Sequence, residues 1–211
     1  MTEAYAAFGR TRQKQRTRAA LKAAAIELMK QGQSPTLEQV ADLARVSRST
    51  AYRYFSSRDA LHAEVQLDTA IRDGIDAIIV AAGRSADAAV RLATVVHEDH
   101  ALVAGHETAF RTALQAFVAP VTPQPGRLPA RPGNRLRYLT VALEPLHDRL
   151  GPERLARLVA ALALCVGIES LVVTEDICNL EQAEAEQVKQ WAARALLDQA
   201  LRDAAADSTT R

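Results

Sequence analysis

A polar run between residues 47 and 58 carries the side chains with the clearest chemistry in this sequence. It contains hydroxyl, guanidinium and phenol groups in close succession: Ser47, Arg48, Ser49, Thr50, Tyr52, Arg53, Tyr54 and Arg58. Groups of this kind donate hydrogen bonds to phosphate oxygens and to the edges of bases. The run therefore predicts contacts with double-stranded DNA, provided that a helix presents it.

Two short helices joined by a tight turn are predicted to position this run. Thr36 and Gln39 have the spacing of a capping box, so we expect a helix to begin at Leu37. Its apolar residues fall at i, i+3, i+4 and i+7, which gives one buried stripe. A bend at Arg45-Val46 follows, and Ser47 is placed to cap a second helix over 48–54. This is the pattern of a helix-turn-helix, whose second helix enters the major groove.

The positions within the second helix suggest individual roles. Arg48 opens it, next to Ser49 and Thr50, and an arginine there suits a bidentate contact with guanine O6 and N7. Tyr52 and Tyr54 are placed to donate to phosphates or to touch a thymine methyl group. Thr36, Arg53 and Arg58 are expected to hold phosphates. The competing interpretations are that Arg48 is simply solvated and that the Tyr52 ring packs on the preceding helix.

These residues resemble the TetR/AcrR-type transcriptional repressors. The resemblance lies in T-L-E-Q-V-A from Thr36, V-S-R-S-T-A-Y-R-Y-F from Val46 and S-R-D-A-L from Ser57, within the first third of the chain. It implies the same DNA-contacting positions and a small-molecule pocket among the middle helices. One departure is Arg45, where the family usually has glycine in the turn. Arg45 must either accept a positive φ at a cost of about 1 kcal/mol or change the turn.

Charge is distributed unevenly along the 211 residues. Residues 1–58 hold eleven Lys and Arg against four Asp and Glu, a net charge of +7, whereas residues 59–211 hold fifteen against twenty-one, a net charge of −6. A basic N-terminal segment with a run from Arg10 to Arg18 is where a polyanion would bind. We therefore expect a DNA-binding domain over 1–57 with a basic N-terminal arm, and a second domain over 58–211.

Composition favours an all-helical protein. Aromatic residues make up 4% of the chain and no sustained alternation of apolar and polar residues indicates a strand. There is no apolar run of about 18 residues and no signal-peptide core, so we expect a cytoplasmic protein that does not enter a membrane. Cys165 and Cys178 are expected to be ordinary thiols.

Further helices are predicted from Arg58 onward. A long helix from Arg58 to about Ala82 would lead out of the DNA-binding domain. Five prolines and two glycines make 120–133 a loop. The segment from Pro152 to about Cys178 is apolar on nearly every side, and a last helix is expected over 181–205. Such an all-round apolar helix needs a partner on both sides.

We therefore predict that the last two helices form a homodimer interface, which would place two recognition helices about 35 Å apart on an inverted-repeat (palindromic) operator. The alternative is that they close the core of a monomer.

The predicted function is a ligand-responsive repressor released from DNA by a small-molecule effector. Neither the effector nor its binding residues can be named from the sequence. The alternative is an architectural or adaptor protein that binds DNA without an effector. No phosphate-binding glycine loop, nucleophile elbow or dense metal-ligand set points to an enzyme or to a cofactor. His97 and His100 could share a helix face and bind a metal, but a solvated surface or a pocket corner is the preferred interpretation.

Overall fold

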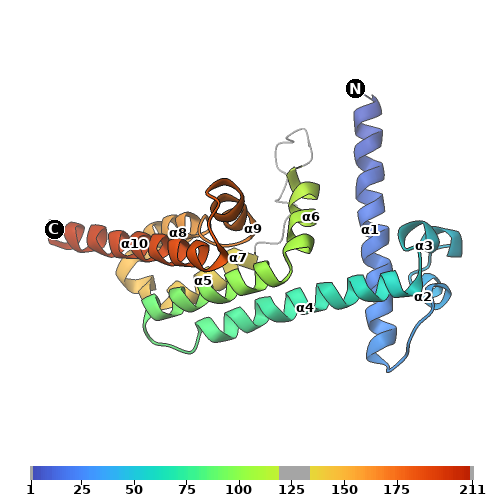
Figure 1. The fold of residues 1–211 in the computed structure, drawn as a ribbon, viewed down its shortest axis with the longest axis horizontal. Coiled ribbons are helices and arrows are strands. Elements are labelled where there is room, and N and C mark those ends of the chain that lie inside the picture. Colours follow the sequence, from blue (N-terminus) through green and yellow to red (C-terminus); the bar gives the residue numbers. More distant parts are fainter. Residues whose placement is uncertain (1, 119–133, 210–211) are drawn as a thin grey trace. The chain divides into compact units, whose positions relative to one another are not determined.

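A computed structural model describes residues 2–118 and 134–209 of the chain (Figure 1). Within these residues every regular element is a helix and no strand occurs. The prediction of an all-helical fold is confirmed. The expected proline-rich loop over 120–133 lies outside the described residues.

Contacts divide the chain into two units, 1–70 and 71–211, which we call the head and the helical unit. The sequence placed the boundary at 57/58, where the helix α4 (Arg58–Ala82) begins. The division by contacts falls within that helix instead, because Leu61 and Val65 are buried in the core of the head. Ile78 and Ala82, further along the same helix, are buried in the core of the helical unit.

The head consists of α1 (Thr2–Lys30), α2 (Leu37–Leu43), α3 (Arg48–Tyr54) and the first turns of α4. One apolar cluster holds them together, with contributions from every helix: Leu21, Ala25, Leu37, Val40, Ala51, Phe55 and Leu61 are among its most buried members. The predicted beginning of α2 and the predicted bounds of α3 and α4 agree with the structure.

The start of the chain differs from the prediction. The basic N-terminal segment was expected to form an arm, but α1 already begins at Thr2. Alanines at positions 4, 6 and 7 favour helix there, and no proline interrupts the segment before Gly32. The basic run is therefore part of a helix.

The helical unit contains the second half of α4, then α5 (Ala88–Gly105), α6 (Glu107–Val118), α7 (Asn134–Leu143), a 3₁₀ turn (Glu144–Leu146), α8 (His147–Leu162), α9 (Ile168–Leu171), a π-helix (Val172–Ile177) and α10 (Gln182–Thr209). The 3₁₀ turn interrupts the helix at Pro145, whose ring cannot continue a regular α-helix. In the main core of the helical unit, α5, α7, α8 and α10 pack around Leu92, Leu139, Leu143, Leu162 and Leu197.

The segment from Pro152 to Cys178 is not the single helix that its composition predicted. α8 ends at Leu162, and Gly167 adopts a positive φ of 84° before the short α9 and the π-helix. Arg135 lies against this turn: a Cβ at Gly167 would stand 2.7 Å from Arg135 Nη2. Glycine is needed here both for the backbone angle and for the space. Apolar periodicity could not reveal this break, because a buried helix and a buried turn are equally apolar.

Candidate nucleic-acid interface

The front of α2 is fixed by a complete capping box. The backbone N–H of Thr36 donates to Gln39 Oε1 over 2.8 Å, and the backbone N–H of Gln39 donates to Thr36 Oγ1 over 3.3 Å. The predicted cap is confirmed. It places Thr36 at the exposed beginning of α2, where a nearby phosphate would meet it.

The turn between α2 and α3 is a Schellman motif with an arginine in the left-handed position. Arg45 N donates to Asp42 O over 3.1 Å, and Val46 N donates to Ala41 O over 3.0 Å. Arg45 has a φ of 55°. Of the two outcomes expected for this residue, the chain adopts the first: the turn keeps its geometry and the arginine accepts the strain.

Capping and burial orient α3 together. Ser47 Oγ accepts a hydrogen bond from the backbone N–H of Thr50 over 3.2 Å and lies 2.8 Å from Thr50 Oγ1. On the inner side, Ala51 and Phe55 are buried in the core of the head. The opposite side of α3 is therefore left to solvent, with Arg48, Ser49, Tyr52 and Arg53 all exposed.

One carboxylate of α2 bonds to two of these exposed side chains. Glu38 Oε1 accepts a hydrogen bond from the Tyr52 hydroxyl over 2.9 Å and forms an ion pair with Arg48 Nη2. Hydrogen bonds from its own backbone N–H, from Tyr52 and from Thr36 lower the pKa of Glu38 to about 2. Nothing local in the sequence indicates that Glu38 would reach α3.

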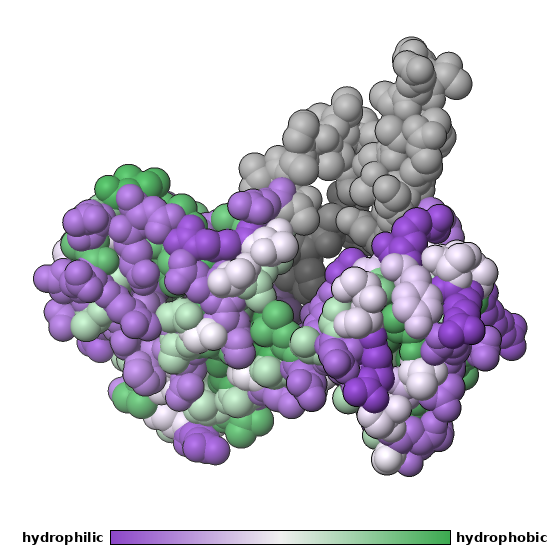
Figure 2. Space-filling view, turned by 45° about the vertical axis from the view of Figure 1, so that its right-hand side comes forward, coloured by the Kyte–Doolittle hydropathy of each residue, from purple (hydrophilic) through white to green (hydrophobic). Residues whose placement is uncertain are grey.

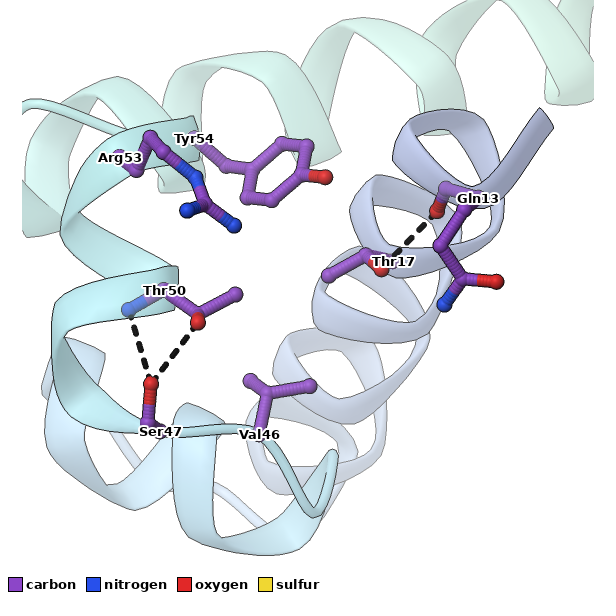
Figure 3. A pocket seen from close by; sticks show the side chains of 7 residues that line it. All are labelled: Gln13, Thr17, Val46, Ser47, Thr50, Arg53 and Tyr54. Carbon is purple, nitrogen blue, oxygen red and sulfur yellow. Dashed lines mark hydrogen bonds between the residues drawn. The ribbon is translucent and has the colours of Figure 1, made fainter. Parts of the chain in front are cut away.

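A groove of about 530 Å³ lies between α1 and α3 (Figure 3). Gln13 and Thr17 face it from α1, Val46 from the turn, and Thr50, Arg53 and Tyr54 from α3. The Arg53 guanidinium carbon stands 5.7 Å from the centre of the Tyr54 ring. Arg53 and Tyr54 were predicted to meet phosphates, and the structure brings both to this groove. Gln13 and Thr17 were not among the predicted residues, since nothing local in the sequence brings α1 to α3.

Part of the positive charge of α1 is used inside the head. Arg18 and Lys22 both form ion pairs with Glu64, and Lys22 Nζ lies 2.5 Å from Asp68 Oδ2. Hydrogen bonding to Glu64 raises the pKa of Arg18. These contacts join α1 to the start of α4, so Arg18 is not a free phosphate ligand. Arg16 is exposed, whereas the side chains of Arg10, Arg12 and Lys14 lie outside the described part of the chain.

Arg58 opens α4 as predicted. Its Nε donates to Asp59 Oδ1 over 3.0 Å, and the guanidinium remains about half exposed. Ser57 Oγ accepts from the backbone N–H of Ala60 over 3.1 Å, so this serine caps the beginning of the helix. An exposed cation at the beginning of α4 fits its predicted contact with a phosphate.

Ionisable groups are also buried inside the helical unit. Asp99 accepts hydrogen bonds from the Tyr138 hydroxyl and, over 2.6 Å, from the backbone N–H of Gly167. Lys189 Nζ donates to His100 Nδ1 over 2.5 Å. Burial raises the pKa of Asp99 and lowers the pKa values of His100 and Lys189. A solvated helix surface or a pocket corner was expected around His97 and His100, and nothing in the sequence indicated that His100 would be buried.

A metal site is not formed by the two histidines of α5. His97 Nδ1 lies 2.7 Å from Glu186 Oε1, while His100 faces the Lys189 ammonium, which would repel a cation. Among the residues that the structure describes, no three His, Cys, Asp or Glu side chains stand together as metal ligands would. None of the helices in that same part of the chain is both long and apolar enough to cross a membrane.

A comparison with family models identifies the head. Residues 20–65 match the model of the bacterial regulatory proteins of the tetR family. No curated protein matches the chain. The matched stretch runs from the middle of α1 through the capped helix-turn-helix to Val65 of α4, which is the buried core of the head. The head therefore carries the DNA-binding domain of the tetR family of bacterial regulatory proteins, which identifies the chain as a DNA-binding transcriptional regulator.

Proposed function

We propose that this regulator is a repressor that binds an inverted-repeat operator as a homodimer and leaves DNA when a small-molecule effector binds the helical unit. The observation that carries the DNA-binding part is the orientation of α3. Its inner side is anchored by Ala51 and Phe55, so Arg48 and Tyr52 face solvent, with 69% of the Arg48 side chain and 46% of Tyr52 exposed. An anchored helix with an exposed polar side is what major-groove binding requires.

The DNA-binding part is tested by selection from a random duplex library with the full chain. We expect enrichment of an inverted repeat whose half-sites lie about one helical turn apart or slightly more. Replacing Arg48 with alanine should reduce discrimination at one base pair of each half-site by about 5- to 150-fold. Arg149→Ala, which removes an exposed arginine from the helical unit, is the matched control. Equal binding of scrambled duplex at moderate salt would contradict a sequence-specific regulator.

Exposed apolar side chains on the helical unit support the homodimer. Leu164, Ile177 and Trp191 are 78%, 72% and 73% exposed in the single chain. Leu164 lies in the turn after α8, Ile177 in the π-helix and Trp191 in α10, and α10 contacts both α8 and the π-helix. In the space-filling view, apolar residues likewise show among hydrophilic ones on the surface of this unit (Figure 2). Large apolar side chains at such exposure are typical of a protein–protein interface.

Trp191 provides a direct test because it is the single tryptophan of the chain. If it lies in a dimer interface, its fluorescence should shift to longer wavelength on dilution, as sedimentation shows the dimer dissociating. Replacing Ile177 with glutamate should weaken the dimer by at least about thirtyfold. The control is Val90→Glu on α5, another exposed apolar residue (51%). A monomer at all concentrations, or equal effects of the two substitutions, would contradict this interface.

Two observations support an effector-binding role for the helical unit. Its interior holds Asp99, His100 and Lys189, buried polar side chains of the kind that line ligand sites. α4 is shared between the cores of both units, so a ligand that favours a different placement of this helix would change the spacing of two heads.

A screen of small molecules against the protein–DNA complex tests this part of the proposal. A compound that raises the melting temperature of the free chain should also release the DNA. If compounds bind the helical unit and DNA affinity does not change, the chain is the DNA-binding adaptor of the alternative interpretation.

A further inference from the structure

The contact of Glu38 with α3 is a feature of the head that DNA binding alone does not explain. The exposed ends of Arg48 and Tyr52, four residues apart on α3, converge on the same oxygen of one α2 carboxylate. With a pKa lowered to about 2, this carboxylate is ionised under all ordinary conditions. A negative charge therefore stands among the side chains that face DNA, where it repels phosphates.

The contact of Glu38 with Arg48 and Tyr52 is not needed to hold α3 in place. The Arg48 side chain is 69% exposed and Glu38 is 30% exposed, and ion pairs at such surfaces stabilise a fold only slightly. α3 is already held by its Ser47 cap and by the burial of Ala51 and Phe55. The contact must therefore be judged by what it does to the two side chains that point outward.

We propose that Glu38 sets the specificity of DNA binding by competing with phosphates for Arg48 and by holding Arg48 and Tyr52 in a defined orientation. This inference rests on the proposed role of α3 in DNA reading. A random duplex offers Arg48 mainly phosphate oxygens, which must compete with a carboxylate already in contact. A guanine in the operator offers O6 and N7 as a bidentate replacement. Glu38 thus lowers affinity for random DNA more than affinity for the operator.

The Glu38→Gln substitution tests this proposal, because glutamine keeps an oxygen that can accept from Tyr52 and removes only the charge. The probe is a 30-base-pair duplex of random sequence, with binding followed by fluorescence anisotropy over a series of salt concentrations. At about 100 mM salt we expect Glu38→Gln to raise affinity about three- to tenfold. The plot of log K against log salt should steepen by about 0.9, the value for one additional phosphate contact.

Asp42→Asn is the matched control. Asp42 is an exposed acid of the same short helix, and its replacement changes the net charge equally without touching the contact to α3. Circular dichroism melting of each variant verifies the fold. In an Arg48→Ala background, Glu38→Gln should no longer raise affinity beyond the effect of Asp42→Asn, since the freed cation is missing.

Selection from a random library measures the second part of the proposal. The Glu38→Gln protein should enrich a preferred sequence at least about threefold less than the wild type, with the loss concentrated at the base pair read by Arg48. The inference is overturned if Glu38→Gln and Asp42→Asn behave alike, if the gain persists without Arg48, or if affinity falls equally for random and selected DNA. If the wild-type chain binds no duplex at all, the proposed function itself fails, which is a different result.

Discussion

Replacement of Arg45 by glycine is expected to stabilise the head. Arg45 is exposed and sits in the left-handed region with a φ of 55°, at the one position of the α2–α3 turn where the Schellman motif needs this angle. An L-residue with a Cβ pays roughly 1–2 kcal/mol for that conformation. Glycine avoids this strain, but it gives the unfolded chain extra freedom that costs about 0.4–1 kcal/mol. The net gain should be about 0.5–1 kcal/mol.

Amide hydrogen exchange measures this effect in the right part of the chain. Trp191 reports only on the helical unit, whereas the N–H groups of Ala44 and Ala51 are hydrogen-bonded within α2 and α3. A gain of 0.5–1 kcal/mol would slow their exchange about two- to fivefold. The matched control is Arg45→Ala, which removes the charge and keeps the Cβ, and it should bring no gain. If the amides of Arg45→Gly are no better protected than those of Arg45→Ala, backbone strain at Arg45 does not destabilise this turn.

Two further predictions concern the helical unit and are measured by urea unfolding with Trp191 fluorescence. A Cβ at Gly74 of α4 would stand 2.5 Å from Leu102 Cδ1, so Gly74→Ala should destabilise the wild type by about 1 kcal/mol. In a Leu102→Ala background the same substitution should stabilise the chain by about 1 kcal/mol, because alanine has the higher helix propensity. Destabilisation in both backgrounds would contradict the steric explanation. Burial, together with the Lys189 ammonium, lowers the pKa of His100 from 6.5, so the unfolded chain takes up this proton first and the free energy of unfolding should fall as pH drops below about 6.5. His100→Gln should make this loss of stability smaller. The pKa of His97 is raised beside a glutamate, so His97 contributes stability that is lost as pH rises, and replacing it should make the loss at low pH steeper. An unchanged pH profile in both variants would show that neither histidine titrates differently on folding.

Local signals in the sequence were sufficient for the helix-turn-helix. The capping box of Thr36, the serine cap of α3 and the beginning of α4 at Arg58 were each predicted to the residue. Caps involve groups within four residues of one another, and an apolar stripe repeats within two turns. Such features are written in consecutive residues, so no knowledge of distant contacts is needed to find them.

Composition alone was a weaker guide where the chain is apolar throughout. It predicted one helix from Pro152 to Cys178, but the chain breaks at Gly167 under the side chain of Arg135 and continues as a π-helix. The sequence also predicted an N-terminal arm where α1 is helical from Thr2. In both places the outcome depends on packing or on extended helix propagation that periodicity does not encode.

The sequence by itself determined which residues stand on the exposed side of α3 and that this side is polar and basic. Only the tertiary structure decided what those residues touch. Glu38 meets Arg48 and Tyr52 across the turn, Gln13 and Thr17 come from α1 to the groove, and Lys189 reaches His100 from 89 residues along the chain. Hydrogen bonds within a turn follow from local backbone geometry, whereas contacts between helices depend on how each helix is rotated and placed by its buried face. That placement comes from the core as a whole, and it turns an exposed arginine into one already held by a carboxylate.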